Sequence, residues 1–206
     1  TGTNRLQAAN PVQINENAAS NDATESTVIN TNPAVHTAAE QRTIEAYQKS
    51  VDNQLLNWIN KVKDAFRSGD MTASKMRKVV GEVTENAASA IKEAADIDVA
   101  GYKHMIDGSA VRHIDIRHGA NGEADNSMQN AQDVARVKFV LDDFDTCNLV
   151  KDENGRIKTS ATFRNSDNTS APLLRFSKKI NGTYYVVEAV PDSKDKKLHI
   201  ITAYMQ

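Results

Sequence analysis

The sequence predicts an α+β fold, with helices in the first part of the chain and an antiparallel sheet in about the last sixty residues. Between residues 44 and 94, apolar side chains recur at steps of three and four, as on one face of a helix. Further on, Val, Thr, Ile, Tyr and Phe dominate and turn signals separate short runs, which is typical of strands. Because the helices precede the strands rather than alternate with them, α+β is favoured over α/β.

Composition limits what the chain can do. Its 206 residues, 39% apolar and 25% charged, suffice for one core plus an accessory helical part. The formal net charge of -2 disfavours a non-specific DNA-coating protein, so any nucleic-acid contact needs a local basic patch. Cys147 is the single cysteine, which excludes an intramolecular disulfide and a Cys-rich metal cage. The chain starts at Thr1 rather than Met, which suggests a piece of a longer polypeptide.

Three segments are expected along the chain. Residues 1–36 are rich in Asn, Ala, Thr and Ser without sustained periodicity, and we expect a disordered or extended linker. Residues 37–100 read as a helical adaptor, and residues 101–206 as a helix-plus-antiparallel-sheet domain. No run of eighteen apolar residues occurs, so no membrane contact through a spanning helix is expected.

The adaptor is predicted to be an antiparallel helical hairpin. A stripe from Ile44 to Phe66 marks a long first helix, and Ser68-Gly69-Asp70 ends it. A second helix is expected over residues 72–97, and the two would pair. Gly81 inside the second helix would mark a close helix crossing. The apolar stripe would either pack in the core of the protein or serve as a surface for a partner.

In the last domain, Ser109 is expected to cap a helix that Gly119 ends. Another long helix follows over residues 131–144. Asn181-Gly182 predicts a tight hairpin between residues 173–180 and 183–190. A final strand over residues 198–205 should place alternate residues on one face, namely Leu198, Ile200, Thr202 and Tyr204.

Three of the five histidines, His104, His113 and His118, fall within fifteen residues. Such a cluster is a candidate for acid/base chemistry, although a helix cap with two surface histidines is an equally good reading. His118 shares a helix face with the apolar residues, whereas His113 lies about 140° round the helix and should turn away. Their spacing of five does not converge on a metal, so no metal site is expected.

Metal-free acid/base chemistry on a phosphate also needs cations and hydroxyls. The later strands offer Arg175, Lys178, Lys179, Thr202 and Tyr204. Taken singly, the lysines are more often a solvated strand face, and the other two more often simple strand formers. Gly-rich phosphate loops and Gly-x-Ser-x-Gly elbows are absent from the sequence, which disfavours nucleotide hydrolysis and α/β-hydrolase chemistry.

Four segments carry a family resemblance: His-Ile-Asp-Ile-Arg-His-Gly (113–119), Gln-Asp-Val-Ala-Arg-Val (132–137), Phe-Ser-Lys-Lys-Ile-Asn-Gly-Thr-Tyr-Tyr-Val-Val-Glu-Ala-Val (176–190) and Leu-His-Ile-Ile-Thr-Ala-Tyr (198–204). Together they resemble phage-encoded members of the barnase–EndoU–colicin–RelE-like (BECR) nuclease superfamily. These nucleases occur as modules of large phage polypeptides and of MuF-type polymorphic toxins. The resemblance covers about residues 100–206.

The resemblance implies a ribonuclease-like fold that cleaves RNA, including tRNA, without metal or cofactor, by attack of a ribose 2′-hydroxyl on the adjacent phosphate. In that reading His118 is the general acid/base. Lys178 or Lys179 neutralises phosphate charge, and Thr202 and Tyr204 position the phosphate or donate to it. The residues implied to bind substrate are Arg117, Arg175 and His113.

The implied setting is a toxin or effector. Its partners would be an RNA substrate and an immunity protein or a phage or secretion-system carrier, and it would pass from a virion or delivery particle into the target-cell cytoplasm. Two alternatives stay open. One is a catalytically inactive virion or partner-binding module with the same fold, and the other is a transferase that uses a nucleotide.

Overall fold

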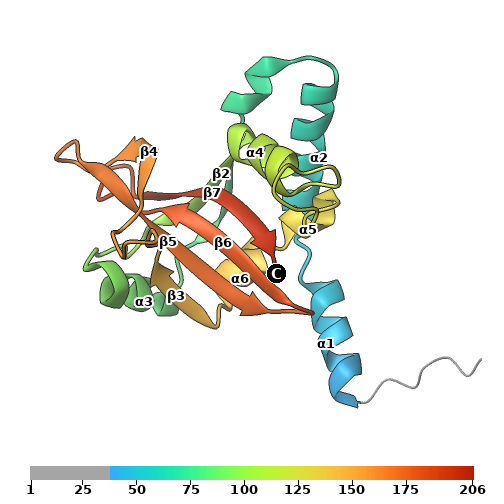
Figure 1. The fold of residues 1–206 in the computed structure, drawn as a ribbon, viewed down its shortest axis with the longest axis horizontal. Helices are drawn as coiled ribbons and strands as arrows, with labels where there is room; N and C mark the ends of the chain where they lie inside the picture. Colours follow the sequence, from blue (N-terminus) through green and yellow to red (C-terminus); the bar gives the residue numbers. More distant parts are fainter. Residues whose placement is uncertain (1–37) are drawn as a thin grey trace, which may run out of the picture. The chain divides into compact units, whose positions relative to one another are not determined.

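The computed structural model describes residues 38–206, so the expected linker over residues 1–36 lies outside the described part. It confirms the α+β class: two helices come first, and a seven-stranded sheet packs with the later helices (Figure 1). The elements in chain order are α1 (Ala38–Lys49), α2 (Asn53–Arg67), the 3-10 turn η1 (Met71–Lys75), β1 (Arg77–Glu82), α3 (Glu85–Ala95), β2 (Lys103–Asp107), α4 (Gly108–His118), α5 (Ala131–Ala135), α6 (Val137–Asp142), β3 (Thr146–Leu149), β4 (Thr159–Arg164), β5 (Ser170–Lys179), β6 (Thr183–Ala189) and β7 (Lys197–Met205).

The sheet has the order β1-β2-β7-β6-β5-β3, and β4 pairs with β5 off this path. Its strands pair antiparallel except β2 and β7, which run parallel. The expectation of a purely antiparallel sheet from the C-terminal residues is therefore wrong in two respects. Two of its strands come from earlier in the chain, and one of its pairings is parallel. None of the helices in residues 38–206 is both long and apolar enough to cross a membrane.

The second arm of the expected helical hairpin is not a helix. Residues 72–97 form η1, β1 and α3 in succession. Two adjacent β-branched valines favour the strand, and the Thr84 hydroxyl then starts α3 by accepting from the Ala87 N–H at 3.1 Å. Gly81 lies in β1 at a register irregularity and marks no helix crossing. Because β1 joins the main sheet, residues 37–100 are not a separate adaptor.

The expected first helix is divided into α1 and α2. The Asp52 carboxylate accepts from the Leu55 N–H at 2.7 Å and starts α2. Most of the apolar stripe faces inward: Leu55 and Val62 are buried in the core, and Tyr47, Val51, Trp58 and Phe66 are partly buried and pack against it. That part of the stripe is core and is not available as a partner surface.

The expected helix over residues 131–144 is also divided, at the buried Arg136. Arg136 donates from Nη1 to Asp133 at 2.7 Å and from Nε to the Ser50 hydroxyl at 3.1 Å. Its guanidinium also lies 3.7 Å from the ring centre of Tyr47. This cation therefore ties α1 to α5.

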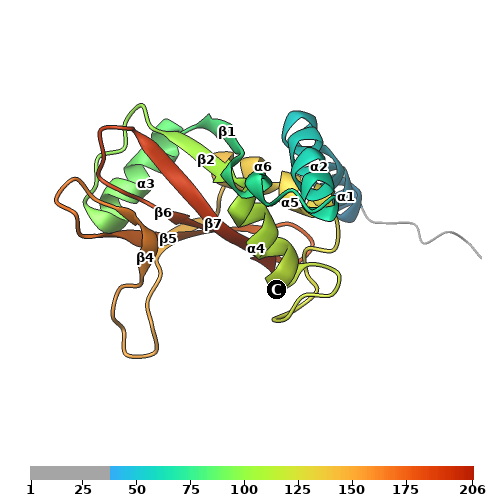
Figure 2. The ribbon, with the colours of Figure 1, turned by 90° about the horizontal axis from the view of Figure 1, so that it is seen from above.

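The two faces of the sheet differ in what covers them. Helices α3 and α6 lie on one side, whereas the β4 arm and the end of α4 lie on the other (Figure 2). On the first side, the core face, Tyr184 is fully buried and donates to the Asp133 carbonyl at 2.6 Å, and Phe176 packs against Phe144. The opposite side, which we call the open face, carries mostly polar side chains.

Helix α4 lies along β7 where that strand has no strand on its outer side, because β2 pairs with β7 only as far as His199. The helix starts at Asp107, two residues before the expected cap Ser109, since the Asp107 carboxylate accepts from the Ala110 N–H at 2.8 Å. It ends at His118, as expected. Gly119 caps it with a φ of -68°, and an added Cβ would lie 2.3 Å from the Asp115 carbonyl oxygen. Close approach, not a left-handed backbone, requires this glycine.

The Asn181-Gly182 hairpin is confirmed, with φ values of 50° and 110° at its two turn residues. The last strand differs from its expectation. Val187 pairs with Thr202 while Glu188 pairs with Ile200, so Ile201 is an extra residue in β7. Because of this bulge, side chains after Ile201 lie on the opposite face from the one that simple alternation from Leu198 would give them. Leu198 and Ile200 therefore lie on the core face, whereas Thr202 and Tyr204 lie on the open face.

Candidate active site

His118 is held by a carboxylate from the loop that follows α4. Its Nδ1 atom lies 2.8 Å from Oδ2 of Asp125. Oδ1 of the same carboxylate accepts from the Ser127 N–H at 3.0 Å and from the Ser127 hydroxyl at 2.7 Å. Burial by itself would raise the pKa of Asp125, but the hydrogen bonds from Ser127 and His118 outweigh it and lower the pKa. An ionised carboxylate at Nδ1 fixes the tautomer and leaves Nε2 of His118 for proton exchange.

The His118 ring begins a stack of side chains that crosses the open face. It lies 5.2 Å from the Tyr204 ring, and Tyr204 lies 5.0 Å from the Tyr185 ring, both in stacked orientation. The guanidinium of Arg175 lies 5.1 Å from the centre of the Tyr185 ring and ends the series. The stack thus runs from α4 over β7 and β6 to β5, with a proton-exchanging group at one end and a permanent cation at the other.

Hydroxyls flank this stack. The Thr146 and Ser177 hydroxyls are 2.7 Å apart, in the cross-strand row that contains Tyr185 and Tyr204. Thr202 lies in the next row, and its Oγ1 is buried without a hydrogen-bond partner in the described part of the chain. A buried hydroxyl without a partner is costly, by about 1–3 kcal/mol. Thr202 therefore lies beside the stack, but its hydroxyl is covered.

The two lysines expected at the site lie apart from it. Lys178 is paired with the core-face residue Tyr184, and its Nζ donates to Asp145 at 3.0 Å and to Asp143 at 3.1 Å. Burial would lower the pKa of Lys178, but these carboxylates outweigh it and raise the pKa. Lys179 is exposed at the hairpin end of β5 beyond Ser177, where it lines a pocket with Lys178 and Asp143. The structure brings neither lysine into the stack.

The other expected residues fall on two sides of α4. Arg117 is exposed and forms an ion pair with Glu123 at 3.1 Å. His113 is exposed, in keeping with its place round the helix from His118, but it is not remote from the sheet. It lines a pocket between α4, β4 and β7, and burial, followed by the charges of His118 and Arg117, lowers its pKa. His113 is therefore neutral at pH 7 and lies beside the open face.

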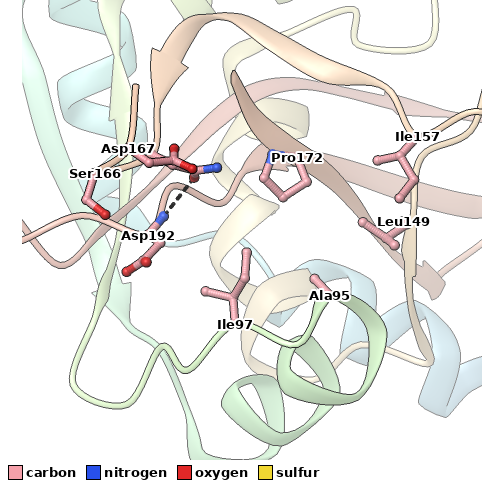
Figure 3. Close-up of a pocket in the computed structure, with 9 residues that line it drawn as sticks. Ala95, Ile97, Leu149, Ile157, Ser166, Asp167, Pro172 and Asp192 are labelled. Atoms are coloured by element: carbon pink, nitrogen blue, oxygen red, sulfur yellow. Dashed lines mark hydrogen bonds between the residues drawn. The ribbon is translucent and has the colours of Figure 1, made fainter. Parts of the chain in front are cut away.

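Two other features are unsuited to the same chemistry. Burial, and secondly the charge of Glu188, raise the pKa of Cys147 to about 12, so this thiol is not an activated nucleophile. A pocket of about 480 Å³ lies between the end of α3, β3 and the loop after β4 (Figure 3). Its described lining includes Asp167 and Asp192 but no histidine, lysine or arginine. Within residues 38–206, no group of three or more His, Cys, Asp or Glu side chains could hold a metal ion.

Sequence reasoning missed two participants. Asp125 lies in a loop without periodicity, and its only signal is the Asp-x-Ser spacing, which is typical of a carboxylate that binds backbone and hydroxyl two residues on. Tyr185 follows another tyrosine directly, so the strand places one ring on each face. Which of the two tyrosines lies on the open face depends on the register of β6 with β5 and β7.

A carboxylate-held histidine, tyrosines and an arginine on one face of an antiparallel-rich sheet can move protons on an anionic substrate. Groups of this kind, gathered on one face, are typical of enzymes that act on phosphate esters. The comparison with known families is specific: the family of phage-Barnase-EndoU-ColicinE5/D-RelE like nuclease3 matches residues 78–206. The match spans more than half of the chain, so the chain belongs to this nuclease family, and the BECR resemblance is confirmed. No curated protein and no solved structure matches the chain.

Proposed function

We propose that this nuclease domain cleaves RNA without a metal ion, by attack of a ribose 2′-hydroxyl on the adjacent phosphate. The observation that supports the proposal best is the His118–Asp125 pair at the end of the stack on the open face. A base that can take the 2′-hydroxyl proton makes the substrate supply its own nucleophile. The products would be a 2′,3′-cyclic phosphate and a free 5′-hydroxyl.

Each residue has a role in this proposal. Nε2 of His118 takes the proton of the 2′-hydroxyl as that oxygen attacks phosphorus, and the 5′-oxygen leaves with a proton returned by the charged ring. Asp125 holds the ring and stabilises it while it is charged. Arg175 and the Tyr204 hydroxyl bind the phosphate oxygens and stabilise the charge that develops on them. Tyr185 holds the Arg175 guanidinium by stacking. Lys179, Arg117 and His113 would contact the chain on either side of the reacting phosphate.

The charge distribution supports binding of RNA at this face despite the net charge of -2. The β4 arm hangs on the same side of the sheet as the end of α4 (Figure 2). It carries the exposed cations Lys158 and Arg164, neither of which forms an ion pair within residues 38–206. A local cluster of this kind can hold a phosphate backbone where the whole chain cannot.

The biological setting is proposed from the family. A nuclease module of phage type would act as a toxin or effector on RNA, including tRNA, in a target cell. It would be carried there by a virion or a secretion particle, and an immunity protein would protect the producer. The second candidate, an inactive virion or partner-binding module, loses support from the inward-facing stripe of α2, which offers little free apolar surface.

The test uses the purified chain with total RNA and tRNA, with and without EDTA, beside His118→Ala. We expect cleavage that EDTA leaves unchanged, products with 2′,3′-cyclic phosphate ends, and a loss of at least about a hundredfold in the variant. An oligonucleotide with a single 2′-deoxy nucleotide should resist cleavage at that position only. Absence of cleavage by the wild type, or equal cleavage by His118→Ala, would contradict the proposal.

A further inference from the structure

A pocket on the open face is lined in part by His113, which lies on the same helix as the proposed catalytic His118. It has a volume of about 290 Å³ and lies between α4, the β4 arm and β7. Its lining residues are Asp107, Ser109, Ala110, His113, Thr162, Phe163, Ile200 and Ile201. His113 and His118 are about 7.5 Å apart along the helix axis and about 140° apart around it. A group bound here would therefore belong to a part of the substrate beyond the phosphate at His118.

One wall of the pocket is aromatic. The Phe163 ring stacks on His199 with a centroid separation of 3.8 Å and an interplanar angle of 11°. Burial lowers the pKa of His199 to about 4, so the ring is neutral at pH 7. The His199 side chain forms no hydrogen bond with another residue of the described part of the chain. This stack joins the β4 arm to β7 and provides a flat apolar surface of the kind on which nucleobases pack.

The part of the lining at the start of α4 presents hydrogen-bond acceptors. Oδ1 of Asp107 accepts from the Ala110 N–H at 2.8 Å and from the Ser109 hydroxyl at 2.6 Å. Oδ2 of Asp107 has no hydrogen-bond partner within residues 38–206. The Ser109 hydroxyl has committed its proton to Asp107, so its lone pairs are the part that can bind a ligand. Two acceptors therefore stand side by side at the start of α4.

We propose that this pocket binds a guanine base of the RNA substrate, with Asp107 and Ser109 accepting from its N1–H and N2–H groups and Phe163 packing on its face. The proposal rests on the proposed function for its RNA substrate. Guanine is the base whose Watson–Crick edge has two adjacent donors. Adenine and cytosine pair one donor with an acceptor, and uracil places its single donor between two acceptors. Two neighbouring protein acceptors therefore select guanine by leaving the other bases with an unpaired or repelled group.

Binding of nucleoside monophosphates tests the pocket without requiring cleavage. The wild type is titrated by calorimetry with the 3′-monophosphates of guanosine, adenosine, cytidine and uridine. We expect guanosine 3′-monophosphate to bind at least about tenfold more tightly than the others. Asp107→Asn keeps the oxygen that caps α4 but places an amide donor against the base, and it should abolish that preference. Phe163→Ala should weaken all four nucleotides together, because stacking is insensitive to base identity.

Asp98→Asn is the matched control, because Asp98 also accepts from a backbone N–H, that of Ala100, outside the pocket. It should bind the four nucleotides as the wild type does. Equal affinity of the wild type for all four nucleotides, or a guanosine preference that Asp107→Asn retains, would overturn the proposal. Guanosine-selective binding by a chain that cleaves no RNA would support the pocket and overturn the proposed ribonuclease function. Cleavage of RNA with no preference for guanosine at the cut sites, together with equal nucleotide affinities, would support the ribonuclease function and overturn the guanine pocket.

Discussion

His104 and Glu188 face each other within the core, with Nδ1 of the imidazole 2.9 Å from both carboxylate oxygens. They lie on β2 and β6, on either side of β7, and are 1% and 0% exposed. Removing one member of such a pair leaves a buried polar group without its partner. We expect Glu188→Leu to lower the free energy of unfolding by about 3–5 kcal/mol. The double variant His104→Leu/Glu188→Leu should recover part of that loss.

Urea unfolding of the two single variants and the double variant completes the cycle. A single variant that unfolds within about 1 kcal/mol of the wild type would show that the pair contributes little.

Asp125 should matter for turnover more than for stability. Asp125→Asn retains a side-chain oxygen for Ser127 but loses the charge that holds His118. We expect RNA cleavage to fall by about 10²–10⁴-fold, with little change in Tm. Glu123→Gln removes another acid from the same loop, one that contacts Arg117, and should leave cleavage within about threefold of the wild type. Equal activity of Asp125→Asn and the wild type would exclude a role for this carboxylate.

Two cations three residues apart on β5 should behave differently. Arg175 stacks on Tyr185 on the open face, whereas Lys178 is bound by Asp143 and Asp145. We expect Arg175→Ala to lower kcat/KM for RNA by at least about tenfold, since a phosphate contact is lost. Lys178→Ala should leave kcat/KM unchanged. Steady-state kinetics on a fluorescent oligonucleotide compare the two variants. A larger loss of kcat/KM in Lys178→Ala than in Arg175→Ala would contradict phosphate binding at Arg175.

Stability should fall between pH 6.5 and pH 4 because of His199. Burial lowers its folded-state pKa from 6.5 to about 4, so in this window the unfolded chain binds the extra proton. The stabilisation is fully present above pH 6.5 and is lost as the pH falls toward 4. We expect a loss of about 2 kcal/mol, allowing for solvent screening of this half-buried ring. His199→Phe keeps a ring against Phe163 and should flatten the dependence in urea melts at pH 7, 6, 5 and 4.5. An equally steep dependence in that variant would assign the effect to other groups.

Two glycines should differ in their tolerance of alanine. A Cβ at Gly108 would lie 1.9 Å from the Ala73 carbonyl oxygen, which is backbone and cannot move aside. Gly108→Ala should therefore lower the free energy of unfolding by about 2 kcal/mol or more. A Cβ at Gly81 would lie 3.5 Å from the Lys138 ammonium, an ordinary contact. Gly81→Ala should stay within about 0.5 kcal/mol of the wild type, and thermal unfolding of both variants compares them. A tolerated Gly108→Ala would show that η1 can shift away from α4.

Much of the local structure followed from short-range chemistry. The Asn181-Gly182 turn, the end of α4 at His118 and the α+β order of elements depend on neighbours in the chain, and the sequence predicts all three. Residues 72–97 show the limit of this reasoning. Their apolar spacing fits a helix, yet pairing with β2 supplies backbone hydrogen bonds that stabilise Arg77–Glu82 as a strand.

For the candidate site, the residue types and the end of a helix at His118 could be predicted from the chain. Which of these residues lie together depends on the register of the strands. One extra residue in β7, Ile201, moves Thr202 and Tyr204 to the open face, and strand register places Tyr185 and Arg175 beside them while it puts Lys178 on the other side. The physical reason is that the side chains of a strand alternate with a period of two. A single bulge, or a register shift of one residue, therefore moves every later side chain of the strand to the other face of the sheet. Neither can be predicted from the spacing of residues in the sequence.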